Sequence, residues 1–226
     1  MSFAARIDYC GLTKYGLALR SNAQNATNGL LEIPASDGSY IGNEIYGHIQ
    51  NPTCEYAISC DTTISATLGN VENSLTGTPY ALQSITINTG AGTEPTVNAT
   101  AVQIESGATK TICTYELTGL SVTPAHHAQT FGAFSYTEST SCVLQGTDLE
   151  ARANIQPPTI NGEPVASDAT AGVVTVNATM WTTAEQAPTV TLAQGWTQTA
   201  DWTCTGADSS LFSWSGTFTK YLSATH

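Results

Sequence analysis

Apolar residues alternate with polar ones along several short stretches of the chain. The alternation covers Tyr80–Asn88, Thr96–Ile104, Gly172–Trp181 and Pro188–Leu192. A period of two places the apolar side chains on one face of a β-strand, so each stretch predicts a strand with one buried face. Short strands separated by regular breaks predict an all-β fold, either a β-sandwich or a β-barrel. The turn signals between them are Gly90-Ala91-Gly92, Ser106-Gly107, Gln156-Pro157-Pro158, Asn161-Gly162 and Gly206.

Several short sequence motifs recur at nearly the same spacing. Ile85-Thr-Ile-Asn88 matches Val174-Thr-Val-Asn177, and Pro95-Thr-Val97 recurs as Pro188-Thr-Val190. Their common order favours a duplicated unit of about 88 residues, close to an immunoglobulin-like sandwich. The alternative is convergent composition, because about a sixth of the chain is Thr and strand words then recur by chance. The proposed equivalent pairs are Cys54 with Cys142, Asn88 with Asn177, and Gly107 with Gly195.

The repeat predicts three segments. Residues 1–50 form an N-terminal arm, residues 51–138 a first β unit and residues 139–226 a second. The two units are either two small sandwiches or two halves of one pseudo-symmetric fold.

The N-terminal segment differs from the body in charge. It carries Arg6, Lys14 and Arg20, three of the chain's six cations. Its run at residues 22–29 is polar and rich in turn formers, which indicates an extended arm or loop rather than a core element. A cationic arm beside an acidic body predicts a contact with a neighbouring copy of the chain. Packing of the arm onto its own body is the alternative, since the same charges favour it.

Composition narrows the classes of partner. The 226 residues carry a net charge of −12, and 41% of them are hydrophobic, enough for a sizeable core. This charge repels phosphate, which excludes sequence-independent nucleic-acid binding and adsorption to an anionic membrane. No apolar run approaches the roughly 18 residues of a membrane helix, and the first residues do not form a secretory signal pattern. We therefore expect a protein made in the cytoplasm.

Cysteine and histidine residues give no metal-site pattern. The nearest cysteines, Cys54 and Cys60, are too far apart for the close pairs of a structural zinc site. The six cysteines (Cys10, Cys54, Cys60, Cys113, Cys142 and Cys204) could form three disulfides in a secreted protein, but buried reduced thiols are the favoured interpretation. Adjacent His126 and His127 point to opposite faces of an extended segment, which favours a packing or inter-subunit role over shared metal ligation.

Catalytic motifs are also lacking. The chain contains no GxSxG nucleophile motif, no phosphate-binding GxxxxGK[ST] loop and no GxGxxG. Asp148 and Glu150 share one strand face and are the candidate carboxylate pair for glycoside hydrolysis, but spacing alone does not separate their pKa values. The sequence therefore predicts a protein that is not an enzyme and needs no cofactor or metal.

All four tryptophans fall in the last quarter of the chain. Exposed aromatic rings on strands could stack on sugar rings, as in carbohydrate-binding modules. Burial in a core or an interface is the more common use of Trp on strands. The candidate sugar-stacking residues are Trp181, Trp196, Trp202 and Trp214.

The whole-chain layout resembles that of bacteriophage virion structural proteins, most nearly tail tube (major tail) subunits. The resemblance rests on the leaderless start, the basic arm through Arg20, the acidic Thr-rich body and the closing stretch Phe212–Tyr221. It implies a β-sandwich or half-barrel subunit that stacks into rings around a lumen and reaches its neighbours through arms and loops. The suspected duplication departs from the single-domain tube subunit, and would equally suit a two-domain tail protein or a decoration protein with tandem immunoglobulin-like domains.

The resemblance implies a non-enzymatic subunit of the virion that binds copies of itself and other virion proteins, without specific nucleic-acid or membrane binding. An acidic inner wall suits this role, because it would not hold passing DNA. The alternative is a carbohydrate-binding or adhesive β-sandwich, a decoration or receptor-binding protein, that uses the Trp cluster. Rings or polymers in solution would favour the first interpretation, and a monomer or small closed oligomer the second.

Overall fold

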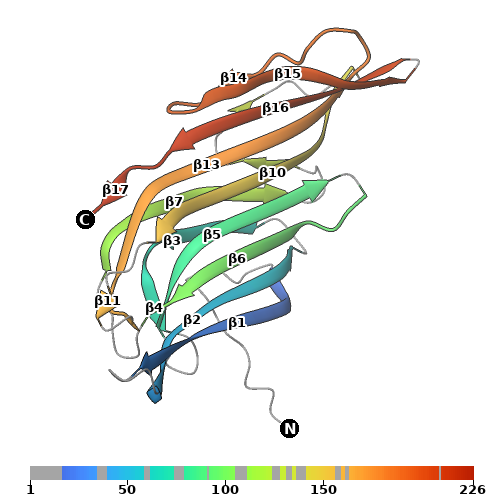
Figure 1. Cartoon of the computed structure of the whole chain (residues 1–226). Helices are drawn as coiled ribbons and strands as arrows, with labels where there is room; N and C mark the ends of the chain where they lie inside the picture. Colours follow the sequence, from blue (N-terminus) through green and yellow to red (C-terminus); the bar gives the residue numbers. More distant parts are fainter. Residues whose placement is uncertain are drawn as a thin grey trace.

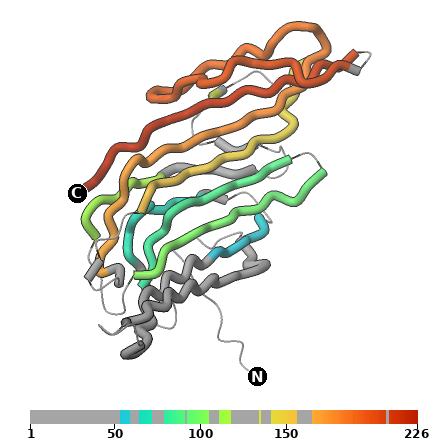
Figure 2. The backbone as a smooth tube through the Cα atoms, in the orientation of Figure 1, coloured from blue at the N-terminus to red at the C-terminus, as the bar shows by residue number. Residues whose placement is uncertain are grey.

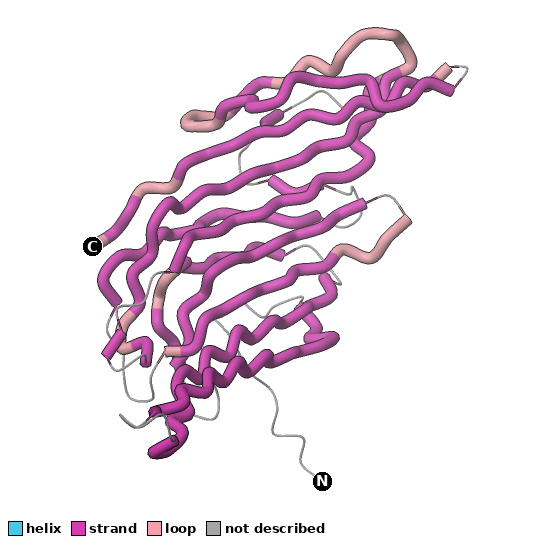
Figure 3. Tube along the Cα trace, in the orientation of Figure 1, coloured by secondary structure: helices cyan, strands magenta, loops and turns pink. Residues whose placement is uncertain are grey.

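The computed structural model describes residues 17–34, 40–58, 62–73, 79–90, 92–104, 111–123, 128–130, 134–135, 141–155, 159–160, 163–208 and 210–226. These residues form strands joined by turns and loops, and no helix occurs among them (Figure 3). The all-β class predicted from the alternation is therefore confirmed.

A large antiparallel sheet dominates the fold (Figure 1). The short strand β4 (Val71–Asn73) adds to it beside β5. The main strands, in their order across the sheet, are β1 (Leu17–Pro34), β2 (Tyr40–Ile58), β6 (Thr96–Gln103), β5 (Pro79–Gly90), β10 (Cys142–Ile155), β13 (Ser167–Thr182), β16 (Leu211–Tyr221) and β15 (Thr197–Asp208).

Alternation along these strands builds one buried face. In β5 the burial follows the sequence pattern, with Ile85 and Ile87 fully buried and their neighbours half-buried. Register then aligns apolar residues of neighbouring strands, because side chains at paired positions lie on the same face. One such buried row runs across five strands through Val97, Ile87, Leu149, Val176 and Phe218.

A smaller second layer covers this buried face. It consists of β3 (Thr62–Leu68), β7 (Thr111–Thr123), β8 (Ala128–Thr130) and the terminal β17 (Ala224–Thr225), and β3 and β7 lie behind the large sheet in Figure 1. Its buried side chains, among them Ile64, Leu68 and Leu117, join those of the large sheet in one hydrophobic core. The described residues therefore pack in two layers, as in a β-sandwich.

Strand β13 connects the two layers. Ala171 and Gly172 lie between the register pairs Arg152–Val173 and Asn154–Thr170, so two residues of β13 oppose one of β10 in a β-bulge. Ala171 has a φ of 54°, in the left-handed region. A bulge bends its strand. The residues of β13 that precede the bulge pair in parallel with β7 in the second layer.

An aromatic group closes the core beside β16. Phe134 of β9 (Phe134–Ser135) stacks on Phe218 with ring centroids 4.8 Å apart, and Trp202 meets the same ring edge-on at 5.7 Å. Strand β14 (Thr191–Leu192) pairs with β9 and holds it in place. The predicted strand at Pro188–Leu192 is thus correct for its last two residues alone. A separate small hairpin joins β11 (Thr159–Ile160) to β12 (Glu163–Pro164).

The segment predicted to be an arm or loop contains a long β-ribbon. β1 pairs with β2 from Leu17–Ile58 to Pro34–Tyr40, so the run at residues 22–29, expected to be an extended arm or loop, is paired strand. Cross-strand pairing outweighs the turn preference of its Asn and Gly residues. The ribbon joins the sheet through Thr53–Ala57 of β2, which pair with β6 (Figure 1).

The predicted duplication does not match the strand order. Cys54 and Asn88 lie on β2 and β5, which β6 separates, whereas Cys142 and Asn177 lie on β10 and β13, which are direct neighbours. The expected equivalence therefore fails for these two pairs. Gly195 lies in a turn with φ 83°, and its proposed counterpart Gly107 is outside the described residues.

Strands from the two predicted β units belong to one continuous sheet. Residues 136–140, and with them the proposed boundary between 138 and 139, are outside the described residues, so the three segments stay a prediction. On its two sides, β5 and β10 pair directly, from Gly90–Gly146 to Ser84–Arg152. Figure 2 shows the strands before and after the proposed boundary side by side in the same sheet, with β5 in green next to β10 in yellow.

Candidate functional site

The large sheet has a polar face that the described part of the second layer does not cover. We call it the open face. It consists of the side chains that alternate with the buried ones on β6, β5, β10, β13 and β16. Its members include Ser84, Thr86, Asn88, Thr96, Asn98, Thr100, Asp148, Glu150, Arg152, Asn154, Thr175, Asn177, Thr179, Ser213, Ser215, Thr217, Thr219, Trp181 and Tyr221.

Register arranges these side chains in rows across the strands. One row runs through Thr96, Asn88, Asp148, Asn177 and Thr217. The neighbouring row through Asn98, Thr86, Glu150, Thr175 and Thr219 is also polar throughout. Strands lie about 4.8 Å apart, so each row presents a donor or acceptor at that interval.

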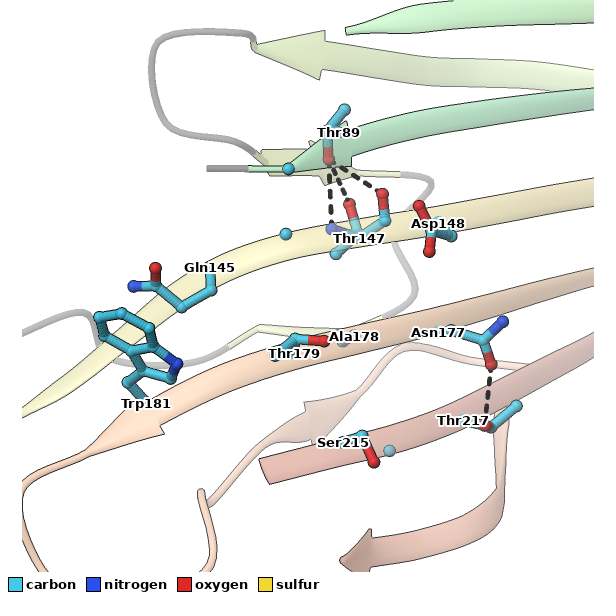
Figure 4. Close-up of a pocket in the computed structure, with 13 residues that line it drawn as sticks. Thr89, Gln145, Thr147, Asp148, Asn177, Ala178, Thr179, Trp181, Ser215 and Thr217 are labelled. Atoms are coloured by element: carbon cyan, nitrogen blue, oxygen red, sulfur yellow. Dashed lines mark hydrogen bonds between the residues drawn. The ribbon is translucent and has the colours of Figure 1, made fainter. Parts of the chain in front are cut away.

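Hydrogen bonds between neighbouring strands tie parts of this surface together. The Thr217 hydroxyl donates to Oδ1 of Asn177 at 2.9 Å (Figure 4). The hydroxyls of Thr199 and Thr219 lie 3.0 Å apart and share a hydrogen bond. Such bonds fix the rotamers of the side chains that present the remaining donors and acceptors.

The charges of the open face are mostly negative. Asp148 and Glu150 are exposed on β10, Glu55 is half-buried on β2, and Arg152 is exposed on β10. Partial desolvation of its carboxyl group by the surrounding protein raises the pKa of Asp148 above its usual value. Asp148 and Glu150 thus share one strand face as predicted. Their separation of two residues on one strand does not assign an acid or base role to either of them.

A hollow of about 530 Å³ lies on this face over β10, β13 and β16 (Figure 4). Trp181 and Gln145 lie near each other at one end of it, and Asp148, Asn177 and Thr217 lie toward the other. Gly90 and Gly146 oppose each other in the register and bring no side chain into the space. The hollow therefore combines an aromatic ring with a carboxylate and two amides.

A second hollow, of about 370 Å³, lies further along the same three strands. Arg152 and Asn154 of β10 line it together with Thr175 of β13, and with Thr219 and Tyr221 of β16. Tyr221 is 81% exposed, the most exposed large hydrophobic side chain among the described residues.

The four tryptophans do not form one platform. Trp181 is 41% exposed on the open face. Trp196 is buried, and Trp202 packs on Phe218 in the core. The Trp214 indole N–H donates to the Thr182 hydroxyl at 2.8 Å, and its strand position opposes the buried Met180.

The sequence did carry a signal that separates these tryptophans. After the bulge, the buried residues of β13 occupy even positions, and Trp181 falls in phase with the polar Asn177 and Thr179. Tyr221 likewise falls in phase with Thr217 and Thr219, opposite to the buried Phe218. Counting the phase of each aromatic residue would therefore have selected Trp181 and Tyr221.

The other predicted site residues are placed as follows. Arg6 and Lys14 lie outside the described residues, as do His126 and His127, and Arg20 lies on β1 where the register with β2 shifts. Cys54 and Cys113 are buried, whereas Cys142 is half-buried and Cys204 exposed. The expectation of buried thiols was therefore wrong for Cys204, because the edge strand β15 leaves it open to solvent. Cys10 and Cys60 are outside the described residues.

Among the described residues, no three His, Cys, Asp or Glu side chains come together as metal ligands. That part of the chain likewise holds no helix long and apolar enough to cross a membrane. Comparison of the chain with models of known protein families gives no match, and comparison with curated proteins gives none either.

Proposed function

We propose that the protein is a non-enzymatic structural subunit that assembles with copies of itself, of the kind found in bacteriophage tail tubes. One observation carries the proposal: among the described residues, an extended sheet has a buried face, an acidic face that the second layer does not cover, and edge strands at both ends. The edge strands are β1 and β15, and each pairs with one strand among the described residues. Edge strands present unpaired backbone groups that can pair with another chain.

The acidic open face supports a role as the wall of an assembly. Asp148, Glu150 and Glu55 outnumber the nearby Arg152, and the whole chain carries −12. A surface of this sign repels nucleic-acid phosphates and would not hold passing DNA. Localisation in a virion, with synthesis in a host cytoplasm, is part of the same proposal.

Size-exclusion chromatography with light scattering, run over a range of concentrations and followed by electron microscopy of the peak fractions, tests the assembly. We expect rings or polymers whose mass grows with concentration. A concentration-independent monomer or small closed oligomer would contradict the proposal and favour the alternative, a carbohydrate-binding or adhesive protein that does not polymerise.

A matched pair of variants tests the role of the edge. Thr203 on β15 and Ser215 on β16 are register partners, one on the edge strand and one a strand further in. Lysine on an edge strand opposes pairing with another chain. Thr203→Lys should therefore reduce the assembled fraction, whereas Ser215→Lys should leave it unchanged. Equal effects of both variants would show that the β15 edge is not the contact.

Deletion of residues 1–20 tests the arm. The positive charge of Arg6, Lys14 and Arg20 complements an acidic neighbour, so the truncated chain should fold but lose assembly. Circular dichroism reports the fold and light scattering the assembly. Normal polymerisation, or failure to fold, would show that the arm is not an inter-subunit connector.

A further inference from the structure

The two hollows of the open face are parts of one elongated surface. Both lie over the same three strands, β10, β13 and β16, and β13 contributes residues to each. Between them run the polar rows described above. An elongated ligand lying along β13 would therefore contact both hollows.

An exposed aromatic ring lies in each hollow. Trp181 lines the first, and Tyr221 lines the second from a position in register with Val173 of β13. Trp181 and Val173 are eight residues apart on one strand, so the two rings are separated by about 26 Å along it at about 3.3 Å per residue. Together with Ala171, Val173 and Ala178, these rings form the apolar part of a largely polar lining, and they fit a ligand with apolar faces.

The groups between the rings are hydrogen-bonding rather than apolar. Between the rings, Asp148 offers a carboxylate and Asn177 an amide. In the row of Tyr221 and just beyond it, Arg152 offers a guanidinium and Asn154 an amide. Threonine and serine hydroxyls of β13 and β16 fill the intervening positions. This set suits a ligand that carries many hydroxyl groups.

A sugar chain has this combination of properties. Each pyranose ring has a face of C–H groups that can lie on an aromatic ring and a rim of hydroxyls that bond to carboxylates and amides. We propose that the open face binds a linear, neutral oligosaccharide along β13, with one sugar ring on Trp181 and another, several rings away, on Tyr221.

Charge and surface chemistry separate this ligand from the other candidates. A nucleic acid or an acidic glycan would bring negative charge to Asp148 and Glu150 on a chain of net charge −12. A hydrophobic peptide would need a continuous apolar groove, and the rows between Trp181 and Tyr221 are polar. The proposal goes beyond the self-assembly proposed above and does not depend on it, because Trp181, Tyr221 and the groups between them all belong to one copy of the chain.

Isothermal titration calorimetry with a panel of neutral hexasaccharides tests the site: cellohexaose, maltohexaose, mannohexaose and xylohexaose. The matching disaccharides and hexagalacturonic acid serve as comparisons. We expect one neutral hexasaccharide to bind and to change the tryptophan fluorescence. Its disaccharide should bind more weakly because it reaches one ring alone, and the acidic hexasaccharide should not bind. No binding by any neutral hexasaccharide, equal affinity for the disaccharide, or equal binding of the acidic glycan would overturn the proposal.

Three variants identify the residues. Trp181→Ala and Tyr221→Ala should each weaken hexasaccharide binding about tenfold, and Trp181→Ala should also abolish the fluorescence change. Leu211→Ala is the matched control, because Leu211 is 39% exposed on β16, close to the 41% of Trp181, and lines neither hollow. Wild-type affinity in either aromatic variant, or an equal loss in the control, would refute the assignment. Circular dichroism of each variant reports whether the sheet is intact.

Discussion

A buried pair of threonines beneath the first hollow predicts an unusual response to mutation. Thr89 of β5 and Thr147 of β10 oppose each other in the register, and both are 2% exposed. The Thr89 hydroxyl accepts from the Thr147 backbone N–H at 3.2 Å and lies 3.0 Å from its carbonyl oxygen and 2.9 Å from its hydroxyl (Figure 4). The Thr89 hydroxyl therefore contacts the backbone N–H, the carbonyl oxygen and the hydroxyl of Thr147. The Thr147 side chain contributes a single hydroxyl to this group.

This asymmetry sets the expected magnitudes. Valine keeps the shape of threonine and removes the hydroxyl, so the changes reflect hydrogen bonding more than packing. Thr89→Val leaves the Thr147 hydroxyl and N–H buried without this partner and should lower the free energy of unfolding by about 2–3 kcal/mol. Thr147→Val leaves the Thr89 hydroxyl its backbone partners and should cost about 1 kcal/mol or less.

The double variant gives the sharper test. Thr147→Val removes the hydroxyl that Thr89→Val has orphaned, so the double variant should be about 1 kcal/mol more stable than Thr89→Val alone. Urea unfolding followed by tryptophan fluorescence, at one protein concentration, measures all four proteins. Additive costs, or a larger cost for Thr147→Val than for Thr89→Val, would refute this account of the pair.

Three further outcomes are expected. Gly172→Ala should lower the free energy of unfolding by about 1–3 kcal/mol in urea titrations, because a Cβ there would overlap the ring of the buried Tyr115; unchanged stability would show that the ring moves freely. Asp148→Asn should stabilise the protein at neutral pH. The raised folded-state pKa means that ionisation disfavours the folded state, so the wild type loses stability as the pH rises from below 3.8 through that raised value, and the gain from Asn should vanish in acid. Thermal melts from pH 3 to 7 check this, and a gain that persists at pH 3 would contradict it. Burial raises the pKa of the Cys54 thiol to about 11, so iodoacetamide at pH 8 should label the exposed Cys204 and spare Cys54, as mass spectrometry of peptides would show; equal labelling would contradict the burial.

Strand identity was largely predictable from the sequence, and strand order was not. Tyr80–Asn88 and Gly172–Trp181 fall on strands, and Thr96–Ile104 does so as far as Gln103, because each pattern is local and each buried face needs period-two alternation. The insertion of β6 between β2 and β5 depends on pairing across about 45 positions, which alternation does not encode. The matching words around Asn88 and Asn177 reflected that shared strand pattern.

The bend in β13 and the residues of the open face were not predicted from the sequence, for different reasons. Ala171 adopts a left-handed φ that alanine rarely takes, so no sequence signal marked the bulge. The open face was visible in the alternation, since its Thr and Asn residues occupy the polar phase of each strand. Trp181 shares this phase, whereas Trp214 of β16 lies in the phase of the buried Met180 and Phe218.

The ladder between β5 and β10 has a consequence for how the chain reaches its folded state. On one side of it lie strands built from residues before position 104, and on the other strands built from residues after position 141. Each side contains hairpins that close over short distances, such as β5 with β6 and β15 with β16. The ladder itself must bring together Ser84 and Arg152, across 68 positions.

Closing a loop of that length costs entropy before its contacts form, so this step should limit the rate of folding. Before β5 and β10 of one chain have paired, β5 can find the same hydrogen-bonding partners in β10 of a second chain as in its own. At high concentration the ladder can then close between chains, and two molecules would exchange halves without changing a single register pair. Refolding at low concentration is therefore the condition under which the single-chain fold should form fastest relative to exchanged dimers.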